Sequence, residues 1–102
     1  MEPIIESKRA AIADLCRRYE VRRLDVFGSA ATGAFDSQRS DVDLLVEFQP
    51  DGNITALDAY FGLKESLEAL FGRPVDLVVA AAVANPYLRS SIERTRRTLY
   101  AA

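Results

Sequence analysis

The sequence contains no histidine and no tryptophan, and its one cysteine is Cys16. A chain without histidine and with one thiol cannot build a zinc-type site from nitrogen and sulfur ligands, and it cannot close an internal disulfide. No hydrophobic run is long enough to span a membrane, and no basic segment followed by an apolar one stands at the start. We therefore expect a soluble, cytoplasmic protein in which Cys16 is a buried, reduced thiol.

The charge balance argues against one class of partner. Thirteen Lys and Arg residues stand against 15 Asp and Glu residues, so the formal net charge is −2. Proteins that bind nucleic acid need an extended basic surface to neutralise phosphates, and this composition offers none along its length. Arginines do gather around Glu93, and we interpret them as one solvated helix face; they are Arg89, Arg94, Arg96 and Arg97. We expect nucleic acid to be a poor acceptor.

Length and periodicity predict the architecture. A chain of 102 residues is large enough for one domain, which we assign to residues 1–102. Apolar periodicity and turn signals predict helices at 3–19 and 56–71, strands at 24–27, 42–48 and 75–79, a short helix after the first strand, and a last helix that starts at Asn85-Pro86. This order predicts an α/β or α+β domain with a small sheet covered by helices on one side.

Two acids stand side by side at the start of the second predicted strand. Because side chains alternate along a strand, Asp41 and Asp43 share one face, while the other face of 42–48 is apolar. A third acid, Asp76, lies within the apolar run 75–79, where a buried and unpaired carboxylate would be strongly unfavourable. Three acids on neighbouring strands would require a divalent cation. Carboxylate oxygens are hard ligands, so the cation that fits best is Mg²⁺.

The first predicted strand ends in a turn, Gly28-Ser29, which suits phosphate. A glycine lets the backbone approach a phosphate closely, and Ser29 offers a hydroxyl donor. The N–H groups at the start of the short helix that begins at Ala30 attract anions. Together with the acids, this turn predicts a nucleotide site with two metal ions.

Each motif also has a simpler interpretation. Asp41 and Asp43 could be ordinary turn acids around Ser40. The Gly28-Ser29 pair could be a turn that only ends a strand. Asp76 could pair with the nearby Arg73. The ordered set is more specific than any one motif.

In that order, Gly28-Ser29, Asp41-Val42-Asp43 and Asp76 resemble the minimal nucleotidyltransferases of the DNA polymerase β superfamily. The likeness covers almost the whole chain. It implies a nucleotidyltransferase core with a small mixed sheet flanked by helices. It also implies that Asp41, Asp43 and Asp76 are catalytic and bind metal, and that Gly28 and Ser29 hold the β- and γ-phosphates of ATP. Two Mg²⁺ ions would then clamp the entering and leaving oxygens at the α-phosphorus.

The chain departs from the family pattern in two places. The family usually has Arg where this chain has Thr32, so one cation expected near the phosphates is missing. Four other arginines are candidates to replace it: Arg22, Arg23, Arg39 and Arg73. The spacer between Ser29 and Asp41 is also one residue longer than in the commonest form of the motif, which a loop can absorb.

The expected function depends on which molecule holds the group that accepts the transferred nucleotide. One small domain leaves no second domain for a substrate, so another molecule must present the attacking group. Stand-alone proteins that resemble this chain are commonly paired with a HEPN-type ribonuclease toxin and act as its antitoxin by transferring AMP from ATP to a toxin tyrosine. We expect the same function here, because each AMP adds charge where the toxin must bind RNA.

Two other functions stay open. The chain could be an inactive binding module that neutralises a partner by occlusion, or an enzyme that modifies a small molecule. Self-modification on Tyr87 or Tyr100 is a further alternative. The adjacent Tyr60 and Phe61 on the helix 56–71 leave one aromatic side chain exposed, which suggests a protein interface and leaves a homo- or hetero-oligomer open.

Overall fold

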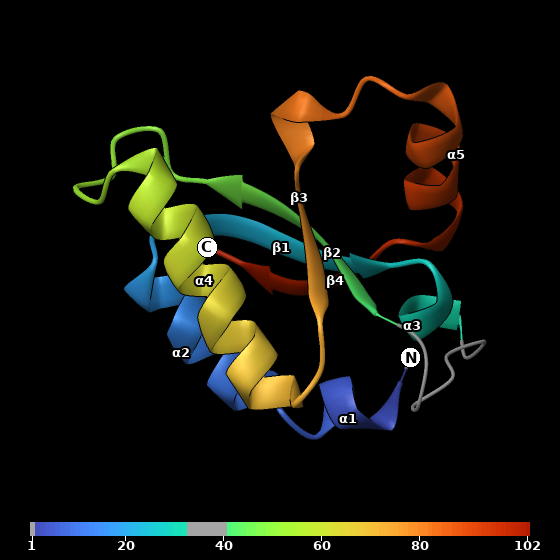
Figure 1. Cartoon of the computed structure of the whole chain (residues 1–102), viewed down its shortest axis with the longest axis horizontal. Coiled ribbons are helices and arrows are strands. Elements are labelled where there is room, and N and C mark those ends of the chain that lie inside the picture. The colour runs from blue at the N-terminus through green and yellow to red at the C-terminus, as the bar shows by residue number, and fades with distance from the viewer. Residues whose placement is uncertain (1, 33–40) are drawn as a thin grey trace.

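The fold is built on a four-stranded mixed sheet with the strand order β3-β2-β1-β4 (Figure 1). The computed structural model describes residues 2–32 and 41–102. The strands are β1 Val21–Phe27, β2 Val42–Phe48, β3 Val75–Val79 and β4 Arg97–Ala101. β1 pairs antiparallel with both β2 and β4, whereas β2 and β3 run parallel. The predicted fold class, a small mixed sheet flanked by helices, is confirmed.

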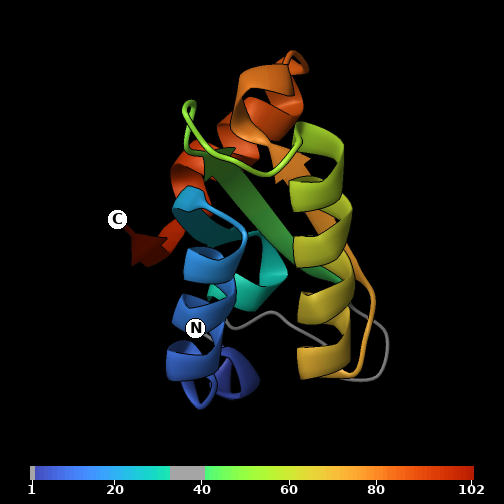
Figure 2. The same cartoon turned by 90° about the vertical axis from the view of Figure 1, so that its left-hand side faces the viewer.

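The helices α2 and α4 cover one face of this sheet side by side (Figure 2). The helical elements are α1 Pro3–Glu6, α2 Arg9–Arg18, α3 Ser29–Thr32, α4 Ala56–Phe71, the 3₁₀ helix η1 Ala80–Ala82 and α5 Pro86–Thr95. Within residues 2–32 and 41–102, no helix has both the length and the apolar character needed to cross a membrane. Gly72 ends α4 in the left-handed conformation with φ 69°, which glycine adopts readily.

The main core lies between the sheet and these two helices. Alternate side chains of β1 and β2 point into it, among them Leu24 and Val46, and they meet Leu63 of α4. Cys16 of α2 is fully buried in the same cluster, as predicted. Burial raises the pKa of its thiol to about 12, so the thiol stays protonated at neutral pH.

The second face of the sheet is covered at one end by α5. Ile92 of α5 packs against Phe27 and Leu45, whose side chains alternate with those of the main core. The expectation that helices lie on one side only was therefore wrong. Asn85 does cap α5 as predicted, because its side chain accepts hydrogen bonds from the N–H groups of Tyr87 and Leu88.

The two ends of the chain differ from the prediction. The first helix is broken at Ser7, which caps α1, and β1 begins at Val21 rather than at residue 24. α5 ends at Thr95, and the chain then forms β4, which pairs with β1. The C-terminal arginines therefore do not form one solvated helix face. Arg97 opens a strand, and pairing with β1 outweighs the local helical pattern.

Candidate active site

β1 and β2 place the glycine turn directly against the first acid of β2. Phe27, the last residue of β1, is paired with Asp43 across the antiparallel ladder, and Gly28 follows it. Gly28 has φ +71°, which L side chains rarely adopt. A Cβ atom at this position would stand 2.8 Å from Oδ2 of Asp43. Both the backbone conformation and the space beside Asp43 therefore require glycine.

β2 and β3 bring the predicted acids together. Asp43 and Asp76 are direct partners in the parallel ladder, so their side chains point to the same side of the sheet. Asp41 is exposed and lies two residues before Asp43, at the start of β2. All three acids thus lie at one end of these two strands, beside Gly28. Strand alternation predicted that Asp41 and Asp43 share a face, and the expectation that the two strands are neighbours placed Asp76 beside them.

The electrostatics of Asp43 reflect this crowding. Burial raises the pKa of its carboxyl from 3.8 to about 6, and the negative charges of Asp76 and Asp41 add to the rise. At neutral pH the carboxylate is mostly ionised in an environment that opposes its charge. A bound cation would relieve this opposition.

The donor set fits a magnesium ion in its chemistry. The three acids that the structure describes at this end of the strands offer carboxylate oxygens, which suit a hard cation. In the part of the chain that the structure describes, no three acidic or cysteine side chains already surround a common metal position. Mg²⁺ takes few protein carboxylates and completes its shell with water and substrate phosphates, so a partly formed set is compatible with it.

The turn itself is held by the backbone and by α5. The carbonyl of Gly28 accepts hydrogen bonds from the N–H groups of Ala31 and Thr32, at 3.1 and 3.3 Å, as α3 begins. The N–H of Gly28 donates to Oγ1 of Thr95 at 2.8 Å. Ser29 is half-buried at the start of α3. Thr95 was not singled out from the sequence.

Thr32 cannot supply the positive charge that an arginine would bring to the phosphates, and the two arginines of β1 pair with acids instead. Thr32 is exposed, and its hydroxyl lies 3.5 Å from the carbonyl of Ser29. Arg22 donates to Glu47 at 2.6 Å, and Arg23 donates to Asp25 at 3.0 Å. Two further positions named from the sequence, Arg39 and Ser40, lie outside the described residues.

Sequence reasoning also missed a buried ion pair near the site. Asp25 of β1 is 0% exposed, and its carboxylate accepts from Nε of Arg23 at 3.0 Å and from Nε of Arg96 at 2.6 Å. The signal was present, because Asp25 stands between Leu24 and Val26 in an apolar strand. The argument that singled out Asp76 holds for this buried carboxylate, whereas Asp76 itself is exposed.

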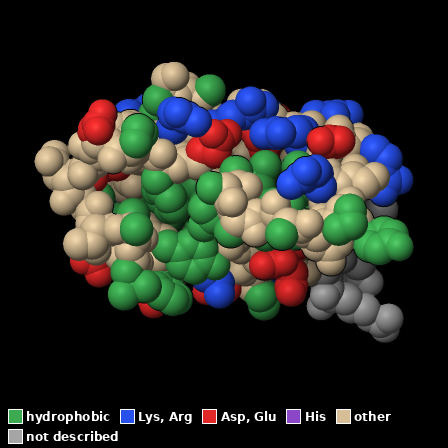
Figure 3. All heavy atoms as spheres, turned by 90° about the horizontal axis from the view of Figure 1, so that it is seen from above, with side chains coloured by type: hydrophobic (Ala, Val, Ile, Leu, Met, Phe, Trp, Pro, Cys, Tyr) green, Lys and Arg blue, Asp and Glu red, His purple; other side chains and the backbone are tan. Residues whose placement is uncertain are grey.

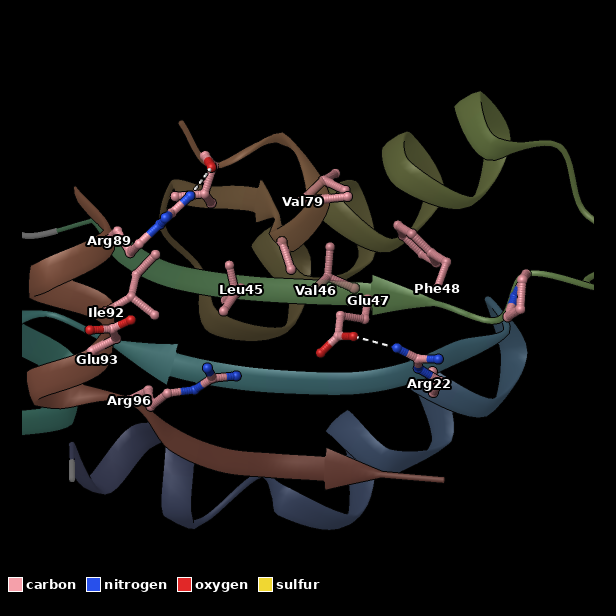
Figure 4. Close-up of a pocket in the computed structure, with 14 residues that line it drawn as sticks. Arg22, Leu45, Val46, Glu47, Phe48, Val79, Arg89, Ile92, Glu93 and Arg96 are labelled. Atoms are coloured by element: carbon pink, nitrogen blue, oxygen red, sulfur yellow. Dashed lines mark hydrogen bonds and ion pairs between the residues drawn. The ribbon is translucent and has the colours of Figure 1, made fainter. Parts of the chain in front are cut away.

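The second face of the sheet also carries an open groove, which the three acids do not line (Figure 4). It has a volume of about 810 Å³ and lies between the second half of β2, η1 and α5. Its apolar lining includes Leu45, Val79, Ala80, Val83 and Ile92, and its charged lining comprises Arg22, Glu47, Arg89, Glu93 and Arg96. Seen from above, basic side chains gather along one side of the molecule, next to exposed hydrophobic ones (Figure 3).

Comparison with known proteins gives consistent results. The family model described as the nucleotidyltransferase domain matches residues 8–99. A relative from Thermococcus cleftensis, named protein adenylyltransferase MntA, is 40% identical over 82 residues, which are 80% of this chain and 74% of that protein. A solved structure described as a candidate minimal nucleotidyltransferase matches with a TM-score of 0.77 and 36% identity over 95% of both chains.

A more distant match shares the fold. It is a chain of a complex described as a tri-AMPylated HEPN toxin of Shewanella oneidensis with an MNT antitoxin. Its TM-score is 0.65 at 19% identity, and the match covers 96% of this chain and 73% of that one.

Proposed function

Because the chain belongs to the nucleotidyltransferase domain family, we propose that it transfers AMP from ATP to a tyrosine of a HEPN-type toxin and so acts as the antitoxin of that toxin. The family that the motifs resembled is confirmed, and the chain is a nucleotidyltransferase. The observation that carries the proposal is the pairing of Asp43 with Asp76 beside Gly28. A metal-dependent nucleotide site needs two neighbouring acids that can bind the metal, next to a glycine that lets the backbone come close to a phosphate.

The relatives support the proposed identity of the transferred group and the proposed class of acceptor. The similarity to a protein named as a protein adenylyltransferase supports AMP as the transferred group and a protein as the acceptor. The fold shared with a complex that contains an AMPylated HEPN toxin supports the class of partner. A tyrosine is the acceptor we expect, since its hydroxyl can attack a phosphorus atom and the product carries a new negative charge.

The residues take the following roles in this proposal. Asp41, Asp43 and Asp76 would hold Mg²⁺, which would neutralise charge on the triphosphate. Gly28 lets the backbone approach the phosphates, and Ser29 would donate its hydroxyl to them. Asp76 would orient the attacking tyrosine hydroxyl. The tyrosine hydroxyl would release its proton to water, its oxygen would form a bond to the α-phosphorus, the bond from that phosphorus to the bridging oxygen would break, and pyrophosphate would leave.

The groove would give the protein acceptor a second place to bind. Asp43 and Leu45 are two residues apart on β2, so their side chains lie on the same face of the sheet. Leu45 lines the groove, whereas Asp43 belongs to the acid cluster. A partner that extends beyond one side chain can therefore reach both. A small acceptor would not need the groove.

The test is labelling with ATP that is radioactive at the α-phosphate, in the presence of Mg²⁺ and a host lysate. The unaltered protein is compared with Asp41→Asn/Asp43→Asn and with Asp51→Asn, which makes the same chemical change at an exposed turn. A protein band labelled by the unaltered chain and Asp51→Asn, but not by the double variant, is expected. Mass spectrometry of that band would then identify the partner and the modified residue.

A second function is favoured by one observation, the exposed Thr32 in place of the usual arginine. If the chain forms a stable complex with its partner, labels nothing, and neutralises the partner equally well as Asp43→Asn, it acts by occlusion. A labelled small product formed without any protein acceptor would instead indicate a small-molecule nucleotidyltransferase.

A further inference from the structure

At the junction between α5 and β4, the side chain of Thr95 forms a hydrogen bond to the candidate active site. Thr95 is the last residue of α5 and is half-buried. Its hydroxyl donates to the carbonyl of Ser91 at 2.6 Å and accepts the N–H of Gly28 at 2.8 Å. Because the hydroxyl proton is committed to Ser91, a lone pair of the oxygen remains directed at Gly28.

The next residue holds the same junction in place. Arg96 donates its backbone N–H to the carbonyl of Ile92 at 2.8 Å and its Nε to the buried carboxylate of Asp25 at 2.6 Å. Asp25 lies on β1, three residues before Gly28. The Asp25–Arg96 pair therefore fixes where Thr95 stands relative to the end of β1.

The position of Gly28 matters because so little space separates it from Asp43. A Cβ atom on Gly28 would lie 2.8 Å from Oδ2 of Asp43, so a small rotation of this peptide changes the surroundings of the carboxylate. Without the Thr95 hydroxyl, the Gly28 N–H would need another acceptor.

We propose that Thr95 is a positioning residue for nucleotide binding, a proposal that rests on the function proposed above. Thr95 holds the Gly28 N–H in a hydrogen bond and so sets the orientation of the Gly28-Ser29 turn. The Gly28 N–H is then already used, so the nucleotide phosphates engage the turn from Ser29 onward. Thr95 does not touch the substrate. It acts through Gly28, which lies close to the Asp43 carboxylate.

The test compares Thr95→Val with Thr95→Ser. Valine keeps the shape of threonine and removes the hydroxyl, whereas serine keeps the hydroxyl. Thr95→Val is expected to raise the KM for ATP about fivefold to tenfold, the effect of losing one hydrogen bond, with a smaller change in kcat. Thr95→Ser is expected to stay within about twofold of the unaltered protein in both constants. Amide hydrogen exchange of Gly28, followed by NMR, should speed up in Thr95→Val and not in Thr95→Ser.

The outcomes separate this inference from the proposed function. If the unaltered protein neither binds ATP nor labels an acceptor, the proposed function fails. If the unaltered protein transfers AMP and Thr95→Val has the same KM for ATP, the positioning role is overturned, even where its melting temperature falls. Should Thr95→Val not fold, Thr95→Ala is measured in its place. An unchanged KM for ATP in that variant overturns the inference in the same way.

Discussion

Asp25 and Arg96, 71 residues apart in the sequence, form an ion pair in which the carboxylate is buried and Nε of the guanidinium lies 2.6 Å from Oδ2. The pair joins the middle of β1 to the residue where α5 gives way to β4. Burying a carboxylate is unfavourable unless it is paired and hydrogen-bonded, and here two arginines, Arg23 and Arg96, supply the donors. The pair therefore stabilises the arrangement in which α5 reaches the glycine turn.

Removing both partners of this pair should destabilise the fold by less than the sum of the two single removals. Arg96→Met leaves Asp25 buried with one donor fewer and should lower the free energy of unfolding by about 3 kcal/mol. In the double variant Asp25→Asn/Arg96→Met the buried charge is gone, so the loss should be smaller than the sum of the single losses. Urea unfolding measures both.

Arg97→Met serves as the control for the ion pair. Arg97 is the exposed neighbour of Arg96, and its replacement should change the free energy of unfolding by less than about 0.5 kcal/mol. Strictly additive losses for Asp25→Asn and Arg96→Met would contradict the coupling.

Strand alternation and chain order predicted more of the site than of the surrounding contacts. The positions of Asp41 and Asp43 followed from the two-residue period of one strand. That Asp76 lies beside Asp43 needed only the expectation that two apolar strands are neighbours. Local patterns of this kind can be recognised directly in the sequence.

Contacts between distant segments cannot be recognised in the sequence in this way. Thr95 and Gly28 are 67 residues apart, and a threonine near a helix end has many uses. β4 was missed because its arginine-rich start continues a helical pattern, while the pairing with β1 that makes it a strand is tertiary. Asp25 stands in an apolar strand as Asp76 does, but its partner Arg96 is 71 residues away, so the ion pair forms no local pattern.

Gly28→Ala should impair activity out of proportion to its effect on stability. The new Cβ would stand 2.8 Å from Oδ2 of Asp43, and the alanine would have to adopt a φ of +71°. We expect the strain to lower the free energy of unfolding by about 1–2 kcal/mol and the displaced carboxylate to lower kcat/KM by about 100-fold. Kinetics of AMP transfer and urea unfolding test the two effects separately.

Gly72→Ala provides a matched control. Gly72 has nearly the same conformation, φ +69°, but among residues 2–32 and 41–102, its two chain neighbours aside, no atom lies within 4 Å of a Cβ built there. This variant should lose similar stability and keep its activity. Equal losses of activity in both variants would show that strain, rather than contact with Asp43, is responsible.

Filling the groove should weaken transfer to a protein acceptor without affecting ATP. Ala81 is exposed and lines the groove, so Ala81→Trp would occupy part of it. We expect transfer to the protein partner to fall about fivefold or more, with an unchanged Kd for ATP by calorimetry. Ala69→Trp, at an exposed position of α4 that does not line the groove, is the control. Undiminished transfer by Ala81→Trp would show that the acceptor does not use the groove.

The raised pKa of Asp43 predicts how the metal-free protein responds to pH. Its pKa is about 6 in the folded chain, against an ordinary value near 3.8. Between about pH 4 and pH 6 the folded state therefore holds more protons at Asp43 than the unfolded state does, and stability falls as pH rises through this range. Asp43→Asn removes the effect. In the presence of a chelator it should melt about 5 °C above the unaltered protein at pH 7, and the two should coincide near pH 4.

Magnesium should reverse this difference, because a cation that binds the folded state stabilises it by mass action. At pH 7, Mg²⁺ with a non-hydrolysable ATP analogue should raise the melting temperature of the unaltered protein and leave that of Asp43→Asn nearly unchanged. Below about pH 6 the stabilisation should decline, since protons compete with the metal for Asp43. The same titration with Asp51→Asn should follow the unaltered protein throughout. If Asp43→Asn gained as much from Mg²⁺ and nucleotide as the unaltered protein, Asp43 would not be a metal ligand, and the acid cluster would need another explanation.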